Sequence, residues 1–131
     1  MAIQSFNVGI KAAIVRDGKI LAVKHKIYGT WSLPGGRIDD KETIEQTLRR
    51  EVREELGLET IEIGDIICAL RDPIGVRQDG SGLLLIAYYV SIPAGSEPQV
   101  SDEHSELAWL SFEDAARDGL EIVQEVVKKL S

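Results

Sequence analysis

The stretch that decides the fold reads GGRIDDKETIEQTLRREVREELGL and runs from Gly35 to Leu58. From Asp39 onward the pattern is helical, with Asp39 or Asp40 as the N-cap and Gly57 as the residue that ends the run. Apolar side chains recur at every fourth position, at Ile44, Leu48, Val52 and Leu56. At about 100° per residue these four sweep an arc of roughly 120° that must face a core. The stretch therefore predicts one amphipathic helix of about four turns.

Three carboxylates gather near the end of this helix. Glu51, Glu54 and Glu55 are spaced i, i+3, i+4, so they lie within one turn and beside the apolar stripe. Like charges repel at this spacing, burial increases the cost, and the helix dipole disfavours negative charge in the last turn. A hard divalent cation offsets these penalties, because Mg²⁺ and Mn²⁺ take carboxylate oxygens and keep waters that phosphate can replace. The cluster predicts a Mg²⁺ or Mn²⁺ site, and the alternative is a solvated charged face that Arg50 and Arg53 partly neutralise.

Four β-strand patterns flank this helix, two before it and two after it. The runs Val8–Val15 and Lys19–Lys26 predict a hairpin whose turn is Asp17-Gly18, a pair suited to positive φ. The runs Ile61–Leu70 and Leu83–Ile92 are rich in β-branched and aliphatic residues and are separated by turn-prone residues. They predict two further strands around a long hairpin loop.

The remaining segments predict one loop, one short strand and a second helix. Tyr28–Gly36 holds three glycines and one proline, a composition expected of a loop that approaches a ligand closely. Leu107–Leu110 predicts a short strand, and Phe112–Leu130 has the apolar spacing of an amphipathic helix. Strands and helices therefore mix, which indicates an α/β fold.

Composition limits the class of protein. The chain has 131 residues, of which 44% are hydrophobic and 28% are charged, so we expect a single domain over residues 1–131. No apolar run approaches the roughly 18 residues of a membrane-spanning helix, and Met1–Phe6 lacks the features of a secretory signal. We therefore expect a cytoplasmic location and no membrane partner. The only cysteine, Cys68, excludes an internal disulfide, so a metal here needs oxygen or nitrogen ligands.

The net charge indicates what kind of partner the chain binds. Fifteen basic against twenty-two acidic residues give a formal charge of -7, which repels nucleic-acid polymers. A small phosphorylated molecule stays compatible with this charge, because a bound divalent cation reverses the local sign.

The spacing in the same stretch resembles the Nudix box at every defined position. The matching positions are Gly36, Glu42, Arg50, Glu51, Val52, Glu54, Glu55, Gly57 and Leu58. The preceding Trp31-Ser32-Leu33-Pro34 and the flanking strand pattern extend the likeness. This resemblance implies an α/β/α sandwich with a central mixed β-sheet, and hydrolysis of a nucleoside diphosphate linked to another group X. Isopentenyl diphosphate isomerases share the fold, but they use cysteine and histidine chemistry that Cys68 alone cannot supply.

The resemblance also implies which residues hold the cation. The ligands would be Glu51, Glu54, Glu55 and the carbonyl of Gly35. Glu103, in a polar loop, resembles a glutamate that in some members binds metal or acts as the base, and a solvated loop charge is the alternative.

The residues expected to serve catalysis are Glu54, Arg50 and Glu103, and Glu42 is expected to support them. Glu54, in the middle of the cluster, is our candidate for the general base, because a carboxylate must accept the proton of the attacking water. Arg50 resembles the box arginine that orients a glutamate, and Glu42 resembles the residue that ties the loop to the helix. We expect Arg50 and Glu42 to support the site structurally and not to take part in the chemical step.

Basic side chains near the expected strand ends are candidates for phosphate contacts. They are Lys24, His25, Lys26, Arg71 and Arg77. The alternative for each is a solvated strand end. Trp31 would either stack on a base or, as we expect, pack as part of the core. We expect structural roles for His104 and Cys68.

Two substrate classes fit the sequence about equally. Pro73 lies fifteen residues beyond Leu58, which resembles a spacing in ADP-ribose pyrophosphatases, although a turn after Arg71-Asp72 also explains it. The short chain resembles MutT-type members that cleave nucleoside triphosphates. A catalytically silent nucleotide-binding module is the alternative function, but all the box residues are present. Many relatives are homodimers, so the resemblance allows a homodimer.

Overall fold

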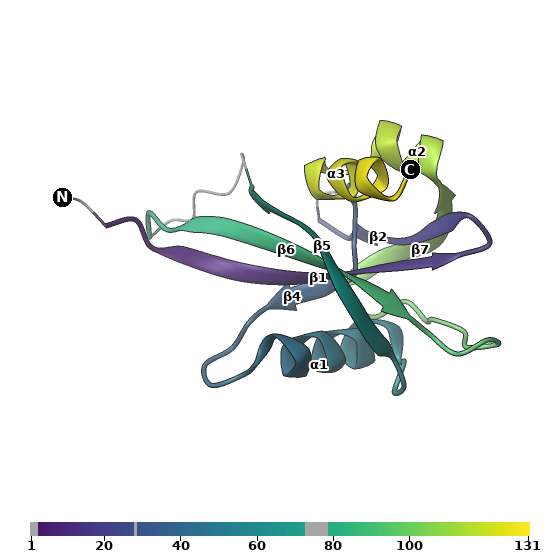
Figure 1. Ribbon diagram of the computed structural model, residues 1–131, viewed down its shortest axis with the longest axis horizontal. Helices are drawn as coiled ribbons and strands as arrows, with labels where there is room; N and C mark the ends of the chain where they lie inside the picture. The colour runs from purple at the N-terminus through teal and green to yellow at the C-terminus, as the bar shows by residue number, and fades with distance from the viewer. Residues whose placement is uncertain (1–2, 28, 73–78) are drawn as a thin grey trace.

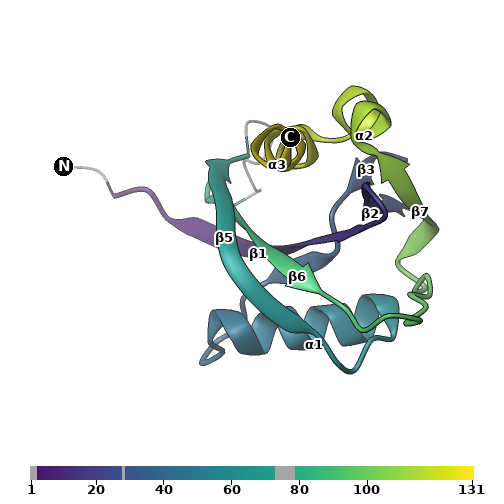
Figure 2. The ribbon, with the colours of Figure 1, turned by 45° about the vertical axis from the view of Figure 1, so that its right-hand side comes forward.

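The computed structural model describes residues 3–27, 29–72 and 79–131, and it forms a sandwich of helices around a sheet. The strands are β1 Phe6–Arg16, β2 Lys19–His25, β3 Trp31–Ser32, β4 Gly35–Arg37, β5 Glu62–Arg71, β6 Gly82–Ser91 and β7 His104–Ser111. The helices are α1 Ile44–Leu56, α2 Phe112–Asp118 and α3 Glu121–Leu130. Helix α1 covers one side of the sheet, while α2 and α3 lie on the other (Figures 1 and 2).

The sheet is mixed. Its strand order is β3-β2-β1-β6-β5, with β4 paired to β1 and β7 paired to β2. Strands β1 and β6 run parallel, whereas the other paired strands run antiparallel. The expected α/β/α architecture with a mixed sheet is therefore confirmed.

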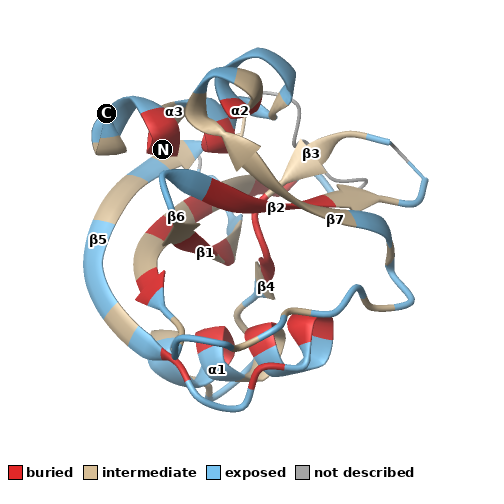
Figure 3. Ribbon diagram, turned by 90° about the vertical axis from the view of Figure 1, so that its right-hand side faces the viewer, coloured by how far each residue is buried: buried red, intermediate tan, exposed pale blue. Residues whose placement is uncertain are grey.

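Two apolar clusters fill the space on the two sides of the sheet. Strand β1 serves both, because its side chains alternate: Ile10 packs with Leu48 of α1, and Ala13 packs with Val123 of α3. The inner faces of α1 and α3 are buried while their outer faces are exposed (Figure 3). The predicted apolar stripe of α1 is confirmed, since Leu48, Val52 and Leu56 are fully buried.

The four long strands agree with the sequence patterns. The hairpin between β1 and β2 turns at Asp17 and Gly18, which have φ values of 52° and 74°. Strands β5 and β6 pair antiparallel, as expected of a long hairpin. Strand β7 begins at His104 rather than Leu107, because it pairs with β2 over most of its length.

The expected start of the first helix is wrong. Thr43 is the N-cap instead of Asp39 or Asp40. Its side-chain hydroxyl accepts a hydrogen bond from the backbone N–H of Gln46, and the side-chain oxygen of Gln46 accepts one from the backbone N–H of Thr43. Lys41 has a φ of 68°, which interrupts the helical path before this cap. Helix α1 is therefore 13 residues long, and it ends at Gly57 as expected, with a φ of 70°.

The expected single helix over Phe112–Leu130 is also wrong, because two helices meet there. Gly119 has extended backbone angles, and its neighbour Leu120 donates its N–H to the carbonyl of Trp31 at 3.0 Å. The extended backbone at Gly119 and this contact with β3 separate α2 from α3.

The expected loop Tyr28–Gly36 contains regular structure. Two short strands, β3 and the beginning of β4, lie within it, because the sheet supplies hydrogen-bond partners on β2 and β1. Within the described ranges, no helix has the length and apolar character needed to cross a membrane.

Candidate active site

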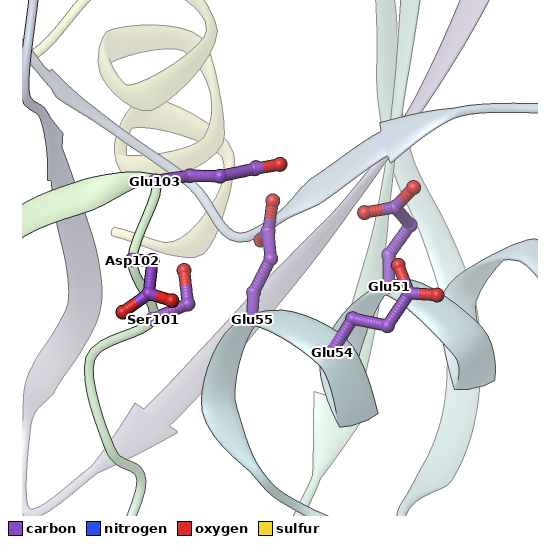
Figure 4. Close-up of a pocket in the computed structure, with 6 residues that line it drawn as sticks. All are labelled: Glu51, Glu54, Glu55, Ser101, Asp102 and Glu103. Atoms are coloured by element: carbon purple, nitrogen blue, oxygen red, sulfur yellow. The ribbon is translucent and has the colours of Figure 1, made fainter.

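Four glutamates from two separate elements line one cleft. Glu51, Glu54 and Glu55 rise from α1, and Glu103 reaches over from the loop before β7 (Figure 4). The cleft has a volume of about 340 Å³, and Ser101 and Asp102 complete the lining. The structure therefore brings together the four carboxylates that the sequence assigned to one site.

Glu55 is the most buried of these carboxylates. Only 7% of the residue is exposed, and its Oε2 accepts a hydrogen bond of 2.8 Å from the Gly35 N–H. Burial raises the pKa of Glu55 to about 7, against the opposing effects of that hydrogen bond and of Lys11, and the charges of Glu51 and Glu103 add to the rise. A positive ion in the cleft would favour the charged carboxylate.

Two glycines allow β4 to approach its neighbours closely, Gly36 on the side of α1 and Gly35 on the side of β1. A Cβ atom on Gly36 would overlap the carboxylate of Glu51, and one on Gly35 would overlap the carbonyl oxygen of Ile10. Gly35 also has a φ of 145°, a backbone angle that residues with a side chain rarely adopt. Glu51 is thus held against the main chain of β4, and burial raises its pKa while Arg50 opposes the rise.

Arg50 connects the loop before the helix to the carboxylates. Its guanidinium donates to both carboxylate oxygens of Glu42, at 2.7 and 2.9 Å, and through Nη1 to Glu51 at 2.7 Å and Glu54 at 3.4 Å. Glu42 also accepts from the Asp39 N–H at 3.0 Å. The Arg50 hydrogen bonds lower the pKa of Glu42 to about 2. These contacts support the orienting role expected of Arg50 and the tethering role expected of Glu42.

The side chains of the site suit a hard divalent cation, although their present contacts hold them apart. All the candidate donors are oxygens, which Mg²⁺ and Mn²⁺ prefer. In the described part of the chain, no three His, Cys, Asp or Glu side chains form a group that could hold a metal ion. Arg50 draws Glu51 and Glu54 toward itself, and the Gly35 N–H fixes Glu55. Cation binding therefore requires Glu51 and Glu54 to turn away from Arg50, whereas Glu55 keeps a second carboxylate oxygen beside its bond to Gly35.

Lys24 and His25, expected to contact phosphates, contact other side chains in the structure. The Lys24 ammonium lies 4.7 Å from the centre of the Trp31 ring and 3.8 Å from Glu106. The His25 ring meets the His104 ring edge-on at 6.0 Å. Neither lines the cleft.

Of the other candidates, Lys26 and Arg71 do not line the cleft. Lys26 is exposed, and the Arg71 guanidinium lies 4.9 Å from the centre of the Phe6 ring. Arg77 and Pro73 lie outside the described residues. The expectation that Trp31 packs as part of the core is wrong, because it belongs to neither apolar cluster. It is half-buried, contacts Lys24 and pairs with Gly119.

Lys11 is the site residue that the sequence analysis missed. It is partly buried in the middle of β1, and its Nζ donates to the Leu33 carbonyl at 3.4 Å. Burial lowers its pKa, and the charges of Glu55, Glu51 and Asp72 oppose this effect. A single lysine within the apolar run Val8–Val15 was the signal that could have found it.

Comparison with known proteins agrees with this site. The family model for the NUDIX domain matches residues 6–130. The chain is similar to a CTP pyrophosphohydrolase of Escherichia coli strain K12, with 31% identity over 110 residues that cover 81% of this chain and 76% of that protein. It is also similar to the nucleoside triphosphatase NudI of Salmonella schwarzengrund, with 35% identity over 94 residues, or 67% of this chain and 66% of that protein.

A solved structure gives the same result. The crystal structure of a MutT NUDIX hydrolase from Burkholderia pseudomallei is similar with a TM-score of 0.78 and 31% identity, and covers 98% of this chain and 100% of that one. The resemblance seen in the box residues is therefore confirmed, and the chain belongs to the Nudix family of pyrophosphohydrolases.

Proposed function

We propose that this Nudix hydrolase cleaves nucleoside triphosphates to a monophosphate and pyrophosphate, and that it depends on Mg²⁺ or Mn²⁺. The observation that carries the proposal is the convergence of Glu51, Glu54, Glu55 and Glu103 on one cleft, with Glu55 buried. The names of the similar CTP pyrophosphohydrolase and nucleoside triphosphatase favour a triphosphate over ADP-ribose.

The cation would be held by these four glutamates and by the carbonyl of Gly35. When bound, it would neutralise charge on the phosphate oxygens and help to position the attacking water. The protein contributes the arrangement of its ligands. The Gly35 N–H holds Glu55 at 2.8 Å, and the absence of a side chain at Gly36 leaves room for Glu51.

Glu54 is our candidate for the general base. Its side chain is 57% exposed, so water reaches its carboxylate, and Arg50 lies 3.4 Å away as an orienting partner. In the reaction, a water oxygen forms a bond to phosphorus, Glu54 accepts a proton from that water, and pyrophosphate leaves with the electrons of the broken P–O bond. Glu103 reaches across the cleft toward Glu55 and is the second candidate for the base.

Product analysis tests the proposal. The purified protein is incubated with Mg²⁺ or Mn²⁺ and, in parallel, with the four common triphosphates and with ADP-ribose. We expect nucleoside monophosphate and pyrophosphate from triphosphates, and no products when EDTA removes the cation. Cleavage of ADP-ribose alone would contradict the substrate class. Binding without products would instead identify a catalytically silent module.

A further inference from the structure

A tight turn at the start of β7 carries Glu103 over the glutamate cleft. The His104 N–H donates to the Ser101 carbonyl at 3.2 Å, which closes a β-turn with Glu103 as its third residue. The Glu103 carbonyl accepts a hydrogen bond of 3.4 Å from the Lys26 N–H, just beyond β2. From this turn the Glu103 side chain extends over Glu55 (Figure 4). The turn therefore brings the fourth carboxylate to the three of α1.

A β-bulge decides on which side of the sheet the His104 ring lies. Strand β7 pairs with β2 at Leu107 and Val23, and both side chains pack in the apolar cluster on the side of α1. Regular alternation along β7 would place Ser105 on that side and His104 on the other. The register shifts by one residue at this point, so His104 instead of Ser105 is the partner of His25. The two histidine rings therefore meet on the side of α1, edge-on at 6.0 Å.

Hydrogen bonds restrain both histidine rings. Nδ1 of His104 lies 3.3 Å from the Ser101 hydroxyl, which can donate or accept, so the bond forms with either tautomer of the ring. Nδ1 of His25 accepts from the Ile27 N–H at 3.1 Å, which fixes the ring that His104 contacts. The His104 side chain therefore links the first residue of the turn to β2.

Glu103 needs such a restraint because its charge opposes its position. Its carboxylate carries the same charge as the three glutamates of α1, so repulsion favours its movement into water. Glu103 is exposed, so burial does little to hold it. Before a cation binds, the restraint must come from the turn and from the side chains that fix the turn.

We propose that His104 is a positioning residue, which holds the turn from Ser101 to His104 so that Glu103 stays directed into the cleft. His104 does not line the cleft. It acts through Glu103, which binds the cation or accepts the proton of the attacking water. The kinetic tests of this inference rest on the proposed function.

Substitutions at His104 and Ser101 test this role. His104→Leu removes the hydrogen bond to Ser101, so we expect kcat/KM for triphosphates to fall about tenfold. His104→Asn keeps a polar atom that can bond the hydroxyl, and we expect kcat/KM within about threefold of the wild type. Ser101→Ala removes the same bond from the other side and should match His104→Leu. Equal losses in His104→Asn and His104→Leu would overturn the inference.

A double-mutant cycle shows whether His104 acts through Glu103. Glu103→Gln should lower kcat/KM by at least about tenfold, and adding His104→Leu should cost less than about threefold more. Additive losses, or wild-type activity of Glu103→Gln, would overturn the inference. The control is Glu106→Gln, which changes an exposed side chain of β7 on the other side of the bulge and should keep wild-type activity.

Amide hydrogen exchange separates this inference from the proposed function, because it needs no turnover. The amides of His104 and Lys26 donate to the carbonyls of the turn. In Ser101→Ala and His104→Leu they should exchange at least about tenfold faster than in the wild type, while exchange in the middle of β2 stays unchanged. If no triphosphate is cleaved but these amides exchange faster, the proposed function fails and the positioning stands. If their exchange is unchanged in both variants, the positioning is wrong whatever the enzyme hydrolyses.

Discussion

Replacing Glu55 by glutamine should stabilise the cation-free protein at neutral and alkaline pH. Burial raises the pKa of Glu55 to about 7 in the folded state, whereas its ordinary value is 4.5. The folded state therefore binds the proton more tightly than the unfolded state, and a difference of this size corresponds to about 3 kcal/mol of unfolding free energy. The penalty is absent below pH 4.5, where both states are protonated, and complete above about pH 7. Glutamine keeps an oxygen for the Gly35 N–H but carries no charge.

Urea unfolding in the presence of EDTA measures this effect at about pH 5 and about pH 8. Between these two conditions we expect the wild type to lose up to about 3 kcal/mol relative to Glu55→Gln. Glu59→Gln, which removes an exposed charge just beyond α1, should follow the wild type. Added Mg²⁺ should restore the wild type at the higher pH and leave Glu55→Gln unchanged. Parallel pH profiles for the wild type and Glu55→Gln would refute the reasoning.

Three further substitutions test other parts of the site. Glu54→Gln should lower turnover by about 10²- to 10⁴-fold with an unchanged unfolding midpoint, and full activity would remove Glu54 from the role of base. Gly36→Ala places a Cβ atom where the Glu51 carboxylate lies, so calorimetry should show weaker Mg²⁺ binding, and wild-type affinity would contradict the close approach. Arg50 lowers the pKa of Glu42 to about 2, so the wild type should lose stability as the pH falls from 4.5 to 2, whereas Glu42→Gln should lose less over that interval. Circular dichroism during acid titration measures this difference, and identical profiles would contradict it.

Local sequence signals predicted those features that depend on one segment alone. The period of four in α1 fixed its buried face, and the i, i+3, i+4 spacing placed Glu51, Glu54 and Glu55 together. The Asp17-Gly18 turn was also predicted, because only a few residue types adopt positive φ readily. The N-cap of α1 was predicted wrongly, because several cap-forming residues precede the helix. Thr43 is the N-cap because it exchanges reciprocal hydrogen bonds with Gln46.

Contacts between distant segments were not accessible from the sequence. The break between α2 and α3 depends on Trp31, almost ninety residues before Gly119, which pairs with it at the sheet edge. The position of Lys11 opposite Gly35 depends on the pairing of β1 with β4. The spacing of apolar residues predicts which face of a helix is buried, but it does not predict where a strand from a distant segment contacts that helix.

The contacts of Arg50 and Gly35 explain how three carboxylates share one helix turn before a cation binds. Arg50 compensates Glu51 and Glu54, while Glu55 relies on the Gly35 N–H and on a proton that its raised pKa retains. A cation must compete with Arg50 for Glu51 and Glu54 and with the proton on Glu55, so its affinity reflects a competition rather than the filling of a rigid cage. Phosphate oxygens of a substrate add ligands that the protein alone lacks, and they tip that competition toward the cation. Binding of cation and nucleotide should therefore be coupled. The phosphate oxygens add ligands to the cation, and the cation offsets the phosphate charge, so together they draw the glutamates away from Arg50.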